Sequence, residues 1–68
     1  MGKRFNQQQL ATDILKRVDG CNTEAELEEV SDMADEAVLV GHITKTAYKA
    51  IEEALDDRLG YLVAEGVI

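Results

Sequence analysis

Two glycines, Gly20 and Gly41, divide this 68-residue chain into three segments of similar length. Within each segment, apolar residues recur at the i, i+3 and i+4 positions, a spacing that brings them to one face of a helix. The chain contains neither proline nor tryptophan and has the length of one small domain. We therefore predict an all-α fold in a single domain spanning residues 1–68. The expected architecture is a three-helix bundle, with helices over residues 7–19, 24–40 and 45–64.

Local signals predict where these helices start. Before the second helix, Thr23 and Glu26 have the S/T-x-x-E spacing of a capping box. Thr44 is the predicted N-cap of the third helix, and Ile43 has the spacing to pack against Tyr48, four residues beyond that cap. The corresponding residues at the first helix are Asn6 as the N-cap and Phe5 with Leu10 as the hydrophobic staple.

The apolar faces predict a small core. A domain of this size buries only about 60% of the surface that its unfolded chain exposes, and the only aromatic residues are Phe5, Tyr48 and Tyr61. A core this thin is often completed by a partner or by a second copy of the chain. The predicted inward residues are Leu10, Ala11, Ile14, Leu15, Val18, Leu27, Val30, Ala34, Ala37, Val38, Ala47, Tyr48, Ile51, Ala54, Leu55, Leu59 and Leu62, with Met33 at the margin.

Negative charge dominates the sequence and is concentrated in the second segment. The chain has 14 acidic and 7 basic residues, a formal net charge of −7, and no Lys or Arg between Glu24 and Glu36. Because affinity for phosphate depends mainly on Lys and Arg contacts, this balance argues against direct nucleic-acid binding and favours a protein partner with a basic surface. The carboxylates predicted to face outward from the second helix are Glu28, Glu29, Asp32, Asp35 and Glu36.

Lys45 and Lys49 occupy unfavourable positions at the start of the third helix. They put like charges four residues apart at the helix end where the dipole favours anions. Our interpretation is that both side chains reach across to the acidic second helix and reduce its self-repulsion. The alternative is a contact with a small anion or with a partner.

The segment from Gly60 to Ile68 is unusually apolar for a chain end. Only one face of the third helix can lie against the core of so small a bundle, so its remaining apolar side chains cannot all be covered. This composition indicates a homodimer or a docking surface. The alternative is a tail that folds back on the core. The residues predicted to form the exposed surface are Tyr61, Val63, Val67 and Ile68.

No pattern in the sequence predicts a catalytic, cofactor or metal site. His42 is the only histidine and Cys21 the only cysteine, and in an up-down-up bundle their loops lie at opposite ends, too far apart for a nucleophile-base pair. Di-metal sites in helical bundles generally contain E-x-x-H pairs, and none occurs here. We therefore expect a non-enzymatic protein without a cofactor. The sequence also contains carboxylate triads at helical spacing, which we interpret as a solvated acidic surface. They are Glu28–Asp32–Asp35 (or Glu36) and Glu53–Asp56–Asp57.

The expected location is the cytoplasm. Residues 1–9 lack the apolar run of a signal peptide, and no segment approaches the roughly 20 apolar residues of a membrane span. A lone cysteine cannot form an internal disulfide and fits a reducing compartment. We expect Cys21 to be an ordinary buried thiol.

Three phrases of the sequence resemble known proteins. They are C-x-T-x-x-E-L-E-x-V from Cys21, G-x-I-T-x-x-x-Y-x-x-I from Gly41 and A-L-x-D-R-L from Ala54. Together they resemble a helical pair found in small accessory and recombination-associated proteins of bacteriophages and other mobile elements. This resemblance implies a helical fold and an accessory role.

A second resemblance is to the Hha/YmoA family of small helical modulators, which bind nucleoid-associated proteins. Asp57 replaces the histidine of that family's D-H-R-L phrase, so the resemblance implies only Asp56 as a partner contact. The residues that carry it are Cys21, Thr23, Leu27, Glu28 and Val30 at the start of the second helix, and Asp56, Arg58 and Leu59 in the third.

The predicted function is that of a small, non-enzymatic interaction module, an accessory or regulatory protein of a phage or mobile element that docks on a larger protein. Two alternatives stay open. An acidic DNA mimic would occupy the nucleic-acid groove of a host protein. A small DNA-binding regulator would insert a helix into DNA, a reading that the net charge disfavours. The predicted partner-binding residues are Glu28, Glu29, Asp32, Asp35, Glu36 and Asp56.

Overall fold

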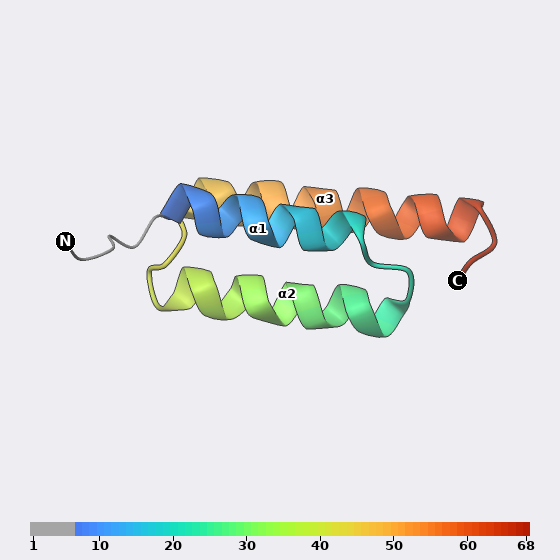
Figure 1. Ribbon diagram of the computed structural model, residues 1–68, viewed down its shortest axis with the longest axis horizontal. Helices are drawn as coiled ribbons and strands as arrows, with labels where there is room; N and C mark the ends of the chain where they lie inside the picture. The colour runs from blue at the N-terminus through green and yellow to red at the C-terminus, as the bar shows by residue number, and fades with distance from the viewer. Residues whose placement is uncertain (1–6) are drawn as a thin grey trace.

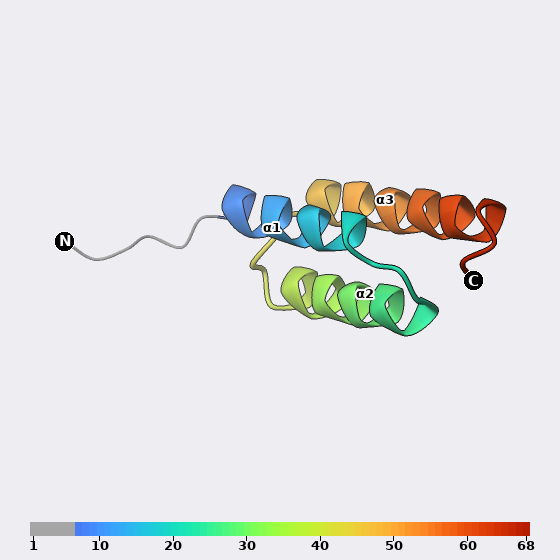
Figure 2. The same cartoon turned by 45° about the vertical axis from the view of Figure 1, so that its right-hand side comes forward.

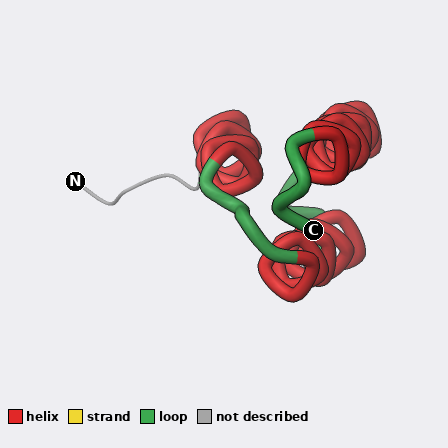
Figure 3. Tube along the Cα trace, turned by 90° about the vertical axis from the view of Figure 1, so that its right-hand side faces the viewer, coloured by secondary structure: helices red, strands yellow, loops and turns green. Residues whose placement is uncertain are grey.

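The computed structural model describes residues 7–68, which form three helices and no strand. The helices run up, down and up (Figures 1 and 2), and seen end-on they occupy the corners of a triangle (Figure 3). This confirms the predicted three-helix bundle. The second helix ends at Leu39, one residue before the predicted end, and the signals predicted at Phe5 and Asn6 lie outside the described residues. The bounds are α1 Gln7–Asp19, α2 Glu24–Leu39 and α3 Lys45–Ala64.

The predicted N-caps of α2 and α3 are confirmed. Thr23 has extended backbone angles, and its hydroxyl oxygen accepts a hydrogen bond from the Glu26 backbone N–H at 3.1 Å. The Glu26 carboxylate in turn accepts from the backbone N–H of Asn22 at 2.9 Å, so two backbone donors are satisfied at this helix end. The Thr44 hydroxyl accepts from the Ala47 N–H at 3.1 Å. These caps fix where each helix begins.

A glycine in the left-handed conformation follows the C-cap of both α2 and α3. Gly41 has φ +80° and Gly66 has φ +76°, a conformation that costs glycine little and other residues more. After α3, the Val67 N–H donates to the Leu62 carbonyl at 2.9 Å and the Gly66 N–H donates to Val63 at 3.1 Å. This pair of bonds is a Schellman motif, which satisfies the last carbonyls of the helix and turns the chain back.

The core lies along the axis of the triangle and contains no buried polar side chain among the described residues. Its most enclosed large side chains are Ile14, Val18, Ile51 and Leu62. Ala34 is fully buried as well. The buried set is Ala11, Ile14, Val18, Cys21, Leu27, Val30, Ala34, Ala37, Ile43, Ile51 and Leu62.

α3 is longer than its neighbours, with 20 residues against 13 in α1 and 16 in α2. Its C-terminal turns extend beyond the ends of both (Figures 1 and 2). Leu62 on these turns is still buried in the core, but side chains on their other faces have little protein to pack against. This overhang accounts for the exposure of Tyr61, Val63, Val67 and Ile68.

Candidate functional site

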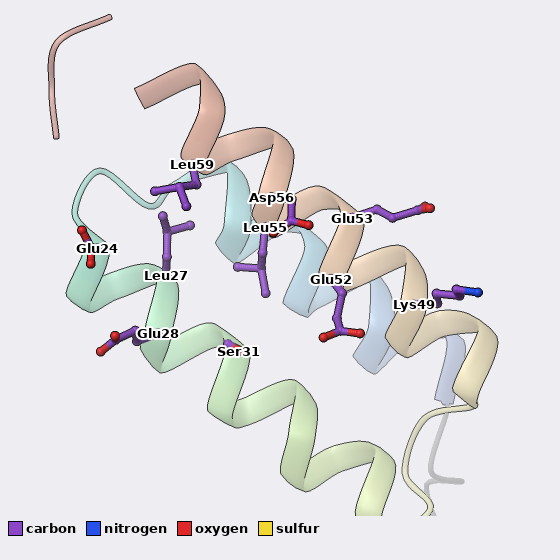
Figure 4. A pocket seen from close by; sticks show the side chains of 10 residues that line it. All are labelled: Glu24, Leu27, Glu28, Ser31, Lys49, Glu52, Glu53, Leu55, Asp56 and Leu59. Carbon is purple, nitrogen blue, oxygen red and sulfur yellow. The ribbon is translucent and has the colours of Figure 1, made fainter. Parts of the chain in front are cut away.

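A groove of about 480 Å³ runs along the surface between α2 and α3. Because these helices follow one another through a tight connection and run in opposite directions, residues that are distant in the sequence meet across it (Figure 4). We call it the α2–α3 groove. It is lined by Glu24, Leu27, Glu28 and Ser31 of α2 and by Lys49, Glu52, Glu53, Leu55, Asp56 and Leu59 of α3.

Three leucines lie at the bottom of this groove. Leu27 points across it toward α3, and Leu55 and Leu59 point back toward α2 (Figure 4). Leu27 is buried and Leu55 is half-buried, but 36% of Leu59 is exposed. The prediction that Leu59 faces the core is therefore wrong. Four residues turn a helix by about 40° more than a full circle, so Leu59 lies at the edge of the inward face that Leu55 occupies.

Carboxylates lie along both sides of the α2–α3 groove. Those of α2 are Glu24 and Glu28, and those of α3 are Glu52, Glu53 and Asp56, all of them exposed. Lys49 is the one cation among the lining residues. A surface that combines leucines with carboxylates on two sides is complementary to a ligand with both apolar and positively charged groups.

Lys49 does not reach across to the acidic helix. Figure 4 shows its amine pointing away from α2, on the same side as Glu53, which follows it by one helical turn. The interpretation that Lys49 reduces the self-repulsion of α2 is therefore wrong. Lys45 is exposed in the first turn of α3, and a partner or anion contact for either lysine stays a prediction.

The carboxylates predicted as one partner-binding surface lie on different sides of the bundle. Glu28 and Asp56 line the α2–α3 groove. Glu29, Asp32 and Glu36 instead line a groove of about 620 Å³ between α1 and α2, which we call the α1–α2 groove. The sequence pattern identifies them all as outward but does not tell which neighbouring helix each one lies beside. The other residues of the α1–α2 groove are Leu10, Ile14, Met33, Ala37, Val40 and His42.

Asp35, the sixth of these carboxylates, forms a contact between α2 and α3. The Tyr48 hydroxyl donates a hydrogen bond to Asp35 and also lies 3.2 Å from the Glu52 carboxylate. Tyr48 thus links α2 to α3 beside the α2–α3 groove and holds two carboxylates close together. The sequence did not predict this role, although a tyrosine at the edge of an apolar face usually finds a partner for its hydroxyl.

Tyr48 makes the stability of the bundle depend on pH. The hydrogen bond to Asp35, followed by burial and the hydrogen bond to Glu52, raises the pKa of Tyr48 above its ordinary value of 10.0. The folded protein therefore holds this proton more tightly than the unfolded chain. The contribution of Tyr48 to the free energy of unfolding is complete below pH 10.0 and is lost as the pH rises above that value.

We expect the free energy of unfolding to fall more steeply in this alkaline range for the wild type than for Tyr48→Phe, which lacks the titrating proton. Urea unfolding followed by circular dichroism at a series of pH values measures both. Tyr61 is present in both proteins and serves as the internal control. Parallel curves for the two proteins would contradict this role of Tyr48.

Arg58 fastens α3 to the connection between α1 and α2. Its Nε donates to the Cys21 carbonyl at 2.9 Å and its Nη2 donates to the Asn22 side chain at 3.3 Å. Its guanidinium also lies 5.2 Å from the centre of the Tyr61 ring, within the range of a cation–π contact. Arg58 precedes Leu59, so these contacts help to fix one end of the α2–α3 groove. The sequence singled out Arg58 only as part of a resemblance.

Cys21 and His42 lie at opposite ends of the bundle, as predicted, because they belong to its two different connections (Figure 1). The Cys21 thiol is buried and donates to the Arg17 carbonyl at 3.1 Å. Burial, with a smaller effect of Glu26, raises the pKa of Cys21, which disfavours the reactive thiolate. Cys21 is thus the buried thiol expected from the sequence. Within residues 7–68, no three His, Cys, Asp or Glu side chains converge as a metal site would require.

All four residues of the predicted surface on the C-terminal segment are exposed. The exposed fractions of Tyr61, Val63, Val67 and Ile68 lie between 40% and 56%. Val63 follows Leu59 by four residues and therefore extends the same face of α3 beyond the groove.

The homodimer expected from this surface stays a prediction. If it forms, Tyr61→Asp places a charge in the contact and should shift the sedimenting species from dimer to monomer. The control is Leu39→Asp, at an exposed position at the C-terminal end of α2. It should leave the sedimenting mass unchanged. A wild type that sediments as a monomer at all concentrations would contradict the prediction.

Comparison of the chain with protein-family models, with curated proteins and with solved structures gave no match. Among the described helices, none is both long enough and apolar enough to cross a membrane.

Proposed function

We propose that this protein is a small, non-enzymatic docking module that binds a larger protein partner with a basic surface. The observation that carries the proposal is the α2–α3 groove, where Leu27, Leu55 and Leu59 lie between carboxylates from both helices. Apolar contacts there would supply affinity, and the carboxylates would select a positively charged partner and speed its association. The resemblance to accessory proteins of phages and mobile elements supports a regulatory role in the cytoplasm as part of the same proposal.

An acidic DNA mimic is the second candidate function. It is favoured by α2, which carries seven acids and no base between Glu24 and Glu36. A mimic would use its carboxylates as substitutes for phosphates, so its binding would depend on charge over the whole acidic surface and would weaken steeply with salt. Docking in the α2–α3 groove depends on particular carboxylates and on the leucines between them. Direct DNA binding would require a basic surface, and the charge of the chain does not supply one.

Two triple variants distinguish these candidates because each removes three negative charges. Glu28→Gln, Glu52→Gln and Asp56→Asn together change the α2–α3 groove, whereas Glu29→Gln, Asp32→Asn and Glu36→Gln together change the α1–α2 groove. All six residues are exposed, and the amide of Glu52→Gln still offers an oxygen to the Tyr48 hydroxyl, so folding should be preserved, and circular dichroism checks this. We call the variant of the α2–α3 groove the groove triple and the variant of the α1–α2 groove the matched triple.

The test is affinity capture from a lysate of the source cells, with the wild type and both triples as bait. Since an exposed ion pair contributes up to about 1 kcal/mol, we expect the groove triple to lose most of the captured partner and the matched triple to retain it. Equal losses from both triples would instead favour the DNA mimic. Capture that neither triple alters would contradict both functions.

A further inference from the structure

We infer that the α2–α3 groove receives an amphipathic helix of the partner, with leucine-like side chains along one face and Lys or Arg on both flanks of that face. The inference rests on the proposed docking function and specifies the shape and chemistry of what docks. In this arrangement the partner's helix becomes a fourth helix beside the three of this protein.

The helical shape follows from the backbone on either side of the groove. Both sides are α-helices, whose N–H and C=O groups are paired within the helix except at the ends. No strand edge exists among residues 7–68. An extended segment in the groove would find no backbone partners and would leave its own polar groups unpaired over the leucines. A helix satisfies its own backbone and presents only side chains.

The length of the groove sets the length of the helix. Along α3, the lining extends from Lys49 to Leu59, a distance of about 15 Å at the helical rise of 1.5 Å per residue. The exposed side chain of Val63 continues the same side of α3 for one more turn, which brings the total length to about 21 Å, of which the apolar part from Leu55 to Val63 is about 12 Å. The complementary segment is therefore a helix of about 10–14 residues, or three to four turns.

The distribution of charge requires basic residues on both flanks of the partner's helix. Glu24 and Glu28 line the groove from α2, while Glu52 and Asp56 line it from α3. The α1–α2 groove differs, because all three of its lining carboxylates belong to α2. It would complement a helix with charge on one flank only. The two grooves therefore select different patterns of charge, and the α2–α3 groove has acids on both sides.

Synthetic peptides of about 14 residues test this inference. The first has leucines at i, i+4, i+7 and i+11 with lysines on both flanks. The second has the same composition in scrambled order, which removes the apolar face. The third carries a central proline, which breaks the helix and leaves an extended chain possible. The fourth has lysines on one flank and glutamines on the other.

Each peptide is titrated into isotopically labelled protein at an ionic strength of about 0.15 M, with binding followed by NMR and peptide helicity by circular dichroism. We expect the first peptide to become helical and to shift the signals of Leu27, Leu55 and Leu59. Affinity should fall at least about 10-fold for the scrambled and proline peptides and by a smaller factor for the one-flank peptide. The groove triple should bind the first peptide about 5- to 30-fold more weakly than the wild type does, and the matched triple less than about 2-fold more weakly.

Three results would overturn the inference. Equal binding of the proline peptide would show that an extended segment suffices. Equal weakening by both triples would show attraction to negative charge without a defined site. Shifts confined to Leu10 and Met33 would place the peptide in the α1–α2 groove. If the groove triple still abolishes partner capture in any of these cases, docking in the groove stands and only the helical occupant is wrong. If capture is unaffected while the first peptide binds as expected, the proposed docking function is wrong.

Discussion

Replacing Ile51 by alanine is expected to lower the free energy of unfolding by about 2–5 kcal/mol, the usual cost of cutting a large aliphatic side chain out of a packed core. Ile51 is fully buried on α3, in a core shared by all three helices. A domain of 68 residues has a total stability of only about 3–10 kcal/mol at typical values per residue. The variant should therefore lose a large share of its stability and unfold at a much lower urea concentration than the wild type.

Leu39→Ala is the matched control for Ile51→Ala, because it removes a side chain of the same size that is 85% exposed at the end of α2. Its effect should stay within about 0.5 kcal/mol. Urea unfolding followed by circular dichroism measures both variants. If Ile51→Ala costs less than about 1 kcal/mol, the packing described for the core is wrong.

The helices of this protein are predictable because their limits depend on neighbouring residues. Thr23 and Thr44 satisfy backbone donors three residues away, and Gly41 provides the left-handed turn after α2. Such interactions are complete within one or two helical turns. The inward residues follow from the same local spacing, which is why all of the predicted core except Leu59 is buried or half-buried.

The contacts that shape the candidate site could not be predicted in this way. Tyr48 meets Asp35 from a position 13 residues further along the chain, and Arg58 reaches the Cys21 carbonyl across 37 residues. Helical periodicity identifies which side chains point outward. It does not specify which neighbouring helix lies beside them. The arrangement of the three helices places the predicted acidic residues in two different grooves, and it leaves Leu59 in an open groove.

Leu59→Ser is expected to weaken binding of the captured partner by about 30-fold or more, because a side chain that acts as a hot spot of an interface contributes about 2 kcal/mol or more. Leu59 lies at the end of the groove near Leu27, and carboxylates of both helices line the same groove (Figure 4). Since more than a third of its surface is exposed, its replacement should cost folding stability less than a core substitution does. The effect on binding should therefore exceed the effect on folding.

Leu39→Ser provides the comparison, because Leu39 is a more exposed leucine that does not line the α2–α3 groove. The most direct measurement is calorimetric titration of the captured partner into the wild type, Leu59→Ser and Leu39→Ser, with the fold of each variant checked by circular dichroism. Docking in the α2–α3 groove predicts a loss of about 30-fold for Leu59→Ser and less than about 2-fold for Leu39→Ser. Equal affinities for all three proteins would contradict it.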